Sequence, residues 1–254
     1  MILRENIIPL LIERLKKEDF IQAAWESGSI AFNRSDEWSD IDLAVVVKDG
    51  NSIEVFAIVE EALKKITPID LKHVIQNPGW EGHEQAFYKL KNTSKFLLID
   101  LSVINESAPD KLLEPEIHGN PLVHFDKTGV TKQYKLDAVS HRNKIEKRIT
   151  SLKVTSELFG GFTEKELNRE NYIDAFSFYY GFTLRPLVEL IRINHTPAHY
   201  NFFSRYVHSE LPSEISERLQ SFFYISDPDE LKAKNIEAQQ WFNEIMAEID
   251  GFTP

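Results

Sequence analysis

The chain has 254 residues, 42% of them hydrophobic, so it can bury the core of one large domain or two modest ones. It carries 29 basic and 40 acidic residues, and the net charge of −11 argues against a long contact with a nucleic-acid backbone and so against a template-reading polymerase. Cysteine is absent, which excludes disulfides and thiolate metal sites.

The first predicted element is a helix over residues 2–17. Its apolar side chains recur at helical spacing and form one face, made of Ile7, Ile8, Leu11, Ile12 and Leu15. Charged residues interrupt these positions, so we do not expect a signal peptide. No apolar run approaches the length of a membrane span. We therefore expect a cytoplasmic protein with no membrane partner.

The most informative stretch is GSIAFNRSDEWSDIDLAVVV, residues 28–47. It follows an apolar segment, residues 20–25, that we interpret as a first strand, and it ends in a buried strand that runs to Val47. Asp40 and Asp42 stand at the start of that second strand, and side chains two apart on a strand point to the same side. Two such carboxylates repel each other unless a cation lies between them. Magnesium is the cation we expect for an all-oxygen site beside phosphates.

The loop before the aspartates has the character of a phosphate site. Gly28 lets the backbone approach a ligand closely, and Ser29 adds a hydroxyl donor. Free N–H groups at a helix start bind phosphate, and a short helix over residues 29–33 fits here. Asn33 tolerates the left-handed conformation and can close that turn.

These residues resemble the nucleotidyltransferase superfamily of the polymerase-β type. The matching positions are Gly28, Ser29 and Ala31, and then Ser39, Asp40, Ile41, Asp42 and Leu43. The pattern is most similar to the aminoglycoside and lincosamide nucleotidyltransferases and to the minimal nucleotidyltransferases. Ile30 stands where a basic residue is common, and Asn33 replaces a second glycine. Both departures leave the metal site intact and concern the contacts with the triphosphate.

Next along the chain we predict a helix that Asn51 and Glu54 cap and that Pro68 ends. A strand over residues 69–75, a loop over 76–84 and strands over 86–90 and 96–104 should follow.

Asp100 is a lone carboxylate in the middle of the last of these strands, on the side opposite the core residues. Burying it unpaired would be strongly unfavourable, so it should pair with a basic residue or join a metal site. The resemblance favours the second reading, because the superfamily has a third carboxylate on a later strand beside the first two. Related antibiotic nucleotidyltransferases use a carboxylate as the base, and Asp100, Glu81 and Glu84 all remain candidates for that role.

Strand signals end after an expected edge strand at residues 122–125, and helix signals repeat from about Thr131. We predict helices that end at Gly160, that begin with a Thr163–Glu166 capping box, and that cover residues 172–194, 200–208, 213–224 and 227–249. The predicted fold class is therefore α+β. A small mixed sheet with flanking helices, residues 1–130, forms the nucleotidyltransferase domain, and an all-α helical bundle, residues 131–254, forms an acceptor-binding domain.

The resemblance implies an adenylyltransferase-like enzyme that moves a nucleoside monophosphate from a nucleoside triphosphate, with ATP expected, to a hydroxyl of a small acceptor. Asp40, Asp42 and Asp100 would bind two magnesium ions, and Gly28 and Ser29 the terminal phosphates. An antibiotic is the family-level expectation for the acceptor, with contacts from Tyr172, Asp174 and Arg185.

Two alternatives remain at this stage. The chain could be a non-catalytic nucleotide-binding module or an antitoxin-like module that binds a protein partner. The presence of all three aspartates and of the helical extension argues against both forms of that reading. A nucleic-acid end-modifying transferase is weakened by the acidity, so we expect no nucleic-acid partner. The oligomeric state is left open by the sequence.

Overall fold

The structure is a computed structural model that describes residues 1–75 and 78–251. It divides into two compact units, Met1–Leu136 and Asp137–Pro254. The boundary that we predicted after residue 130 falls inside the first unit. Residues 76 and 77 of the predicted loop, and residues 252–254, lie outside the described part of the chain.

The first unit is built on a mixed sheet, as predicted. Within the described residues the sheet has six strands in the order β3-β4-β5-β2-β1-β6. The pair β2 and β5 is parallel, and the other neighbouring pairs are antiparallel. The bounds of the strands are β1 Ile21–Glu26, β2 Ile41–Val47, β3 Ile69–Ile75, β4 His83–Leu90, β5 Ile99–Asn105 and β6 Leu122–Asp126. Strand β4 thus begins three residues before the predicted start, and β5 begins three residues after it.

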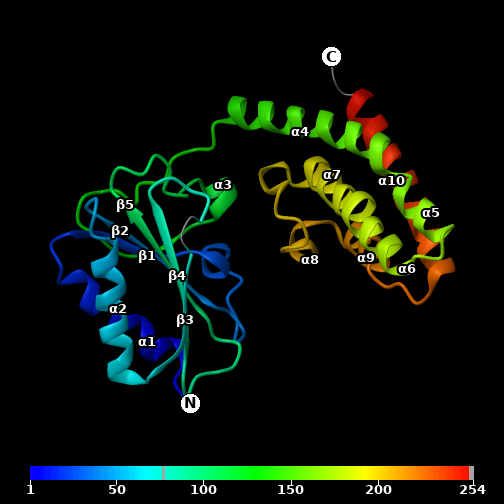
Figure 1. Cartoon of the computed structure of the whole chain (residues 1–254). Helices are drawn as coiled ribbons and strands as arrows, with labels where there is room; N and C mark the ends of the chain where they lie inside the picture. The colour runs from blue at the N-terminus through cyan, green and yellow to red at the C-terminus, as the bar shows by residue number, and fades with distance from the viewer. Residues whose placement is uncertain (76–77, 252–254) are drawn as a thin grey trace. The chain divides into compact units, whose positions relative to one another are not determined.

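Two helices cover one face of this sheet, α1 (Arg4–Lys16) and α2 (Ser52–Ile66) (Figure 1). The main core lies between them and the sheet and includes Ile7, Leu11, Leu15, Leu43, Val45, Val59, Leu63, Leu101 and Val103. The other face carries a smaller cluster made of Ala23, Trp25, Ala44, Val46, Ile104, Ala108 and Leu113. A short helix, α3 (Pro115–His118), precedes β6. Asn51 is the N-cap residue of α2, as predicted, but its side chain makes no capping hydrogen bond.

Among the described residues of the second unit, all regular structure is helical, which confirms the α+β class. Its helices are α4 Ala138–Phe159, α5 Phe162–Leu167, α6 Tyr172–Phe178, α7 Arg185–His195, α8 Val207–Glu210, α9 Ser213–Ser221 and α10 Pro228–Gly251. Their shared core includes Leu152, Tyr179, Leu187, Val188, Leu190, Ile191, Leu219, Phe222 and Trp241. Among the described residues, no helix is long and apolar enough to cross a membrane.

Of two helix caps predicted in the helical unit, one is confirmed and the other is wrong. At the start of α10, Asp227 Oδ1 accepts a hydrogen bond from the Glu230 N–H at 2.8 Å, as predicted. The Thr163–Glu166 capping box is wrong, since both residues lie inside α5 and are buried. Glu166 instead accepts hydrogen bonds from the side chains of Arg169 and Asn171. Its carboxylate therefore fixes the end of α5 rather than its start.

The predicted single helix over residues 172–194 is interrupted. A π-helical turn, Tyr179–Leu184, separates α6 from α7, and Pro186 lies in the first turn of α7. Proline lacks an N–H and its ring clashes with the carbonyl four residues earlier. A wider turn directly before Pro186 relieves that clash without ending the helical path. A proline inside a helix predicts a kink, and the structure shows that the disturbance takes the form of a π-helical turn directly before Pro186.

The predicted helix over residues 200–208 is wrong for most of its length. The chain forms a 3-10 turn, Pro197–His199, then turns, and only then α8. The reason is Arg192, which is fully buried and donates to the backbone carbonyls of Phe203, at 2.6 Å, and of Arg205. A helix would use those carbonyls internally, so the guanidinium competes with the helical ladder. Arg192 also pairs with Glu210 at 2.9 Å.

Candidate functional site

The motif loop has the predicted local structure. A 3-10 turn, Gly28–Phe32, leaves the end of β1, and Asn33 closes it in the left-handed region at φ 56°. Gly28 itself has φ +64°, which only glycine adopts at little cost. Ser29 is partly exposed, and its hydroxyl makes no hydrogen bond to any described residue. The Ser29 hydroxyl therefore has no partner among the described residues, and the positive φ beside it requires glycine.

The glycine is required for a second reason, which the sequence did not show. A Cβ on Gly28 would lie 1.8 Å from Oδ2 of Asp42. The carboxylate of Asp42 thus lies directly against the Gly28 backbone, in space that any other residue would fill. The predicted phosphate-binding residue and the predicted metal ligand are neighbours in the fold.

The three aspartates meet at the start of the parallel pair. Asp42 on β2 lies opposite Asp100 on β5 in register, and Asp40 directly precedes β2. Strand alternation puts Asp42 and Asp100 on the face that carries Ala44 and Ile104, away from α1 and α2. The predicted convergence of three carboxylates is therefore what the backbone produces. Their catalytic and metal-binding roles stay predictions.

Each of two aspartates has a specific partner. Oδ1 of Asp40 accepts a hydrogen bond from the backbone N–H of Leu98 at 3.1 Å. The amide nitrogen of Gln85, on β4, donates to both oxygens of Asp100, at 2.7 and 2.9 Å. We expected Asp100 to pair with a basic residue or to join a metal site, and its observed partner is neutral. The amide fixes the carboxylate and adds no charge to balance it.

Burial and mutual repulsion shift the pKa of two of these carboxyls. Burial, together with the charges of Asp100 and Asp40, raises the pKa of Asp42 to about 6, and the Arg4 guanidinium opposes the change. Burial also raises the pKa of Asp100, with Asp40 adding to the effect and the Gln85 hydrogen bond opposing it. Carboxyls held this way resist ionisation until a cation arrives. Such a cluster is typical of a functional site.

Arg4, Glu26 and His124 were missed by sequence reasoning. Glu26 is the last residue of β1, only 2% exposed, and its carboxylate pairs with Arg4 from α1. Its other oxygen lies 2.8 Å from Nε2 of His124 on β6. A charged residue at the end of a fully buried strand was the available signal.

The other candidate bases do not join the cluster. Glu84 lies opposite Val103, whose side chain belongs to the core beneath α1 and α2, so it points to the face opposite Asp100. Glu81 is exposed in the turn before β4. Among the three candidates, Asp100 is therefore the one that the fold places beside Asp42.

A cavity of about 630 Å³ adjoins this edge of the sheet. It is lined by residues 1–5 and 35–39 and by Ser94, Phe96 and Leu97. Two of the lining residues, Ser39 and Leu97, directly precede Asp40 and Leu98 in the chain. Its volume falls in the range of small-molecule sites. Among the described residues, no group of three or more Asp, Glu, His or Cys side chains is already arranged to hold a metal ion.

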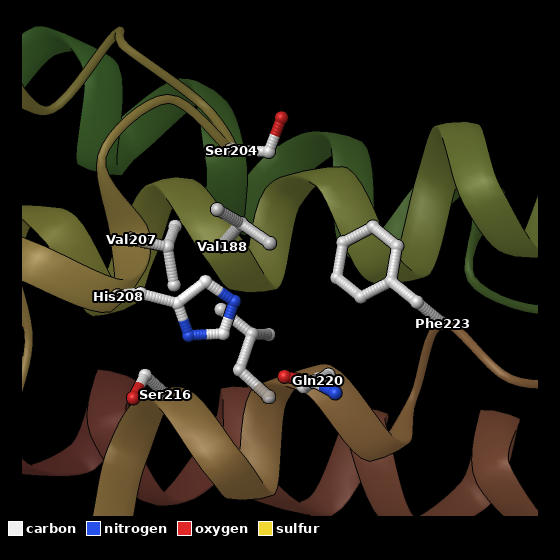
Figure 2. A pocket seen from close by; sticks show the side chains of 8 residues that line it. Val188, Ser204, Val207, His208, Ser216, Gln220 and Phe223 are labelled. Atoms are coloured by element: carbon white, nitrogen blue, oxygen red, sulfur yellow. The ribbon is translucent and has the colours of Figure 1, made fainter. Parts of the chain in front are cut away.

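The helical unit holds the residues proposed for acceptor contacts. Tyr172 and Asp174 on α6 and Arg185 on α7 are all exposed, and Arg185 stacks over the ring of Phe203 at 5.3 Å. A separate hollow of about 190 Å³ lies between α7, α8 and α9. In Figure 2 the His208 ring and the Phe223 ring flank this hollow. Its lining also includes the buried side chains of Val188 and Leu219.

Comparison with known proteins agrees with the first unit. Residues 10–123 match the sequence profile of the family described as "Polymerase beta, Nucleotidyltransferase". No curated protein matches the chain significantly. Among solved structures, an aminoglycoside 6-adenyltransferase from Bacillus subtilis is similar over 97% of this chain and 90% of its own, with 11% identity and a TM-score of 0.38. A TM-score of this size supports no inference about substrate.

The family match spans the Gly28–Ser29 turn, Asp40 and Asp42 at the start of β2, Asp100 of β5, and strands β1 to β5 of the mixed sheet. These agree with the resemblance seen in the sequence. Residues 10–123 therefore form a nucleotidyltransferase domain of polymerase-β-like fold.

Proposed function

We propose that the protein transfers a nucleoside monophosphate, with ATP as the expected donor, to a hydroxyl of a small acceptor and releases pyrophosphate. The observation that carries the proposal is the meeting of Asp40, Asp42 and Asp100 on one sheet edge beside the Gly28 turn. An antibiotic is our proposal for the acceptor class, and it rests on the family resemblance alone.

The site fits a divalent cation by its chemistry. Its donors are carboxylate oxygens, which magnesium prefers, and burial together with repulsion leaves Asp42 short of positive charge. Asp40, Asp42 and Asp100 would hold two magnesium ions, after side-chain movements that draw them together. When bound, such ions neutralise the triphosphate and stabilise the attacking and leaving oxygens.

The protein's own groups would then divide the work. The backbone at Gly28 and the Ser29 hydroxyl would bind the terminal phosphates, because the glycine allows close approach. Asp100, held by Gln85, would accept the proton of the acceptor hydroxyl as that oxygen bonds to the α-phosphorus. The bond from the α-phosphorus to the bridging oxygen breaks, and pyrophosphate leaves with the electron pair.

The helical unit is our proposal for the acceptor-binding part. Its exposed polar groups, Tyr172, Asp174 and Arg185, and the hollow beside His208 are places where a small molecule can be held. The acidic chain would attract a cationic acceptor.

The test is a transfer assay. The full chain, magnesium and each labelled nucleoside triphosphate are incubated with a panel of aminoglycosides, lincosamides and cell metabolites. We expect pyrophosphate release that depends on one acceptor class and that a chelator abolishes. Nucleotide binding without turnover across the panel would favour the non-catalytic alternative, and turnover that is unchanged by chelator would contradict the metal assignment.

A further inference from the structure

One side chain connects the first helix to the aspartate edge. Arg4 lies in the first turn of α1, and its guanidinium donates to the backbone carbonyl of Asp40 at 2.6 Å and to the carboxylate of Glu26. Asp40 precedes the first residue of β2, so its carbonyl lies outside the strand itself. Arg4 therefore supplies the partner for a backbone group at the point where β2 begins.

Glu26 and His124 hold Arg4 in that place. The Glu26 side chain is 3% exposed, and both of its oxygens are used, one by Arg4 and the other by Nε2 of His124 at 2.8 Å. The Arg4 side chain is itself only 19% exposed. A planar guanidinium with two such partners has little freedom, unlike an exposed lysine or arginine pair. Three elements, α1, β1 and β6, thus converge on one carbonyl.

The position of that carbonyl affects both aspartates. The Asp40 carboxylate is bonded to the Leu98 N–H on one side, and Asp42 is two residues further along. The Asp42 carbonyl accepts from the Ser27 N–H at 2.9 Å. A rotation of the Asp40 peptide would therefore turn the Asp40 side chain away from Leu98 and alter the direction of Asp42 next to Gly28.

We propose that Arg4, held by Glu26 and His124, is a positioning residue that fixes the start of β2 so that Asp40 and Asp42 face the substrate side together. This inference rests on the proposed transfer function. It assigns Arg4 no contact with substrate and no role in proton transfer.

The competing explanation is that Arg4 only neutralises buried Glu26. The two explanations differ in a double variant. Arg4→Met alone leaves Glu26 buried without its cation, so thermal stability and activity should both fall under either explanation. In Arg4→Met/Glu26→Gln the buried charge is gone and the melting temperature should recover. If Arg4 positions Asp40, kcat stays about 10- to 100-fold low, with KM for the acceptor near the parent value.

Two further readouts do not depend on turnover. Hydrogen exchange of the Leu98 amide, followed by NMR, should accelerate in the double variant, because that N–H is bonded to the Asp40 carboxylate. The affinity for Mn²⁺, used as a probe, should fall about tenfold or more. Arg4→Lys keeps the positive charge but loses the planar guanidinium that donates to two partners at once. It should fold normally and show a smaller loss of kcat than the double variant. Arg14→Met is the matched control, since Arg14 pairs with Glu18 on the same helix.

A double variant with the parent kcat, parent Leu98 protection and parent Mn²⁺ affinity would overturn the positioning role. If the double variant does not fold, Arg4→Lys decides: parent values of all three measurements would overturn it equally. A parent protein that transfers no nucleotide would contradict the proposed function, while Leu98 exchange and Mn²⁺ affinity would still decide what Arg4 does.

Discussion

Each unit contains a buried cluster of charged residues, and the two clusters differ in whether their charges are compensated by partners. In the helical unit, Arg192 is fully buried, and its guanidinium is satisfied by Glu210, by Thr196 and by two backbone carbonyls. In the first unit, Asp42 and Asp100 have raised pKa values, and the direct partner of Asp100 is a neutral amide.

The two clusters differ in how completely their buried charges are compensated, and this difference indicates the role of each cluster. Because the Arg192 guanidinium has a complete set of partners, its role is structural: it fixes the loop before α8 against α7. The aspartate edge is incomplete: among the described residues its carboxylates outnumber the cations that reach them, Arg4 foremost. A buried charge without a partner costs free energy unless something from outside supplies one. Function is therefore expected at the incomplete cluster.

The largest expected effect comes from removing the charges of the incomplete cluster. Asp40→Asn or Asp42→Asn should weaken magnesium-dependent ATP binding and lower turnover by at least about 10³-fold, because a bound cation supplies several kcal/mol of transition-state stabilisation.

Asp100→Asn should bind ATP nearly normally and lose about 10²–10⁴ in turnover, as expected for a positioned base. Calorimetry and pyrophosphate release measure the two quantities. Parent turnover in Asp100→Asn would reduce Asp100 to a structural strand residue.

Next in size is the effect of breaking the complete cluster. Arg192→Met removes the guanidinium that pairs with buried Glu210, and the free energy of unfolding should fall by about 3–5 kcal/mol. Urea denaturation of the full chain measures the loss. Arg192→Met/Glu210→Gln should recover part of it, since the buried carboxylate charge is then removed together with the guanidinium. Mn²⁺ affinity should not change in either variant, and a large change would contradict the separation of the two clusters.

A smaller effect, of opposite sign, is expected for stability at the aspartate edge. Folding raises the pKa of Asp42 from 3.8 to about 6, so its stabilising contribution is present below about pH 4 and is lost as pH rises through 6. Asp42→Asn, which cannot ionise, should therefore be more stable than the parent at pH 7 by about 2–3 kcal/mol in the presence of chelator. The gain should vanish near pH 4. Denaturation at both pH values tests the sign, and a destabilised variant at pH 7 would contradict it.

The smallest effect concerns a carboxylate that is well supplied with donors. Burial alone would raise the pKa of Asp126, but hydrogen bonds from Thr131, Thr128 and Gly129 lower it to about 2. Its contribution to stability is thus present above about pH 4 and is lost as pH falls towards 2. Because the group is only partly buried, Asp126→Asn should cost only about 1 kcal/mol at pH 7. A loss that stayed the same at pH 2 would show that charge is not the cause.

Much of the first unit could be predicted because local pattern and burial agree there. The alternating strand around Asp100, the Gly28–Asn33 turn and the apolar run of β2 each specify their own structure. Arg4, Glu26, Gln85 and His124 could not be assigned from sequence, because their roles depend on pairing between distant segments.

In the helical unit, prediction from the sequence also fails where contacts between distant residues decide the local structure. Helix signals located α4, α7 and α10, yet the segment before α8 is shaped by the guanidinium of Arg192, which takes the carbonyls a helix would need. Thr163 and Glu166 have the spacing of a capping box, and packing places both inside α5 instead. Tertiary contacts overrode local preference at each of these places.

The parallel pairing of β2 with β5 also has a kinetic consequence. Asp42 and Asp100 are 58 positions apart, and α2, β3 and β4 lie between them along the chain. Closing a loop of that length costs conformational entropy before the contacts between β2 and β5 can stabilise it. Contacts of this kind therefore tend to form slowly. The hairpin-like pairs β3–β4 and β1–β2 can form first. The aspartates should then meet late in folding, after most apolar surface is already buried, and their repulsion would slow the final step of folding rather than the initial collapse.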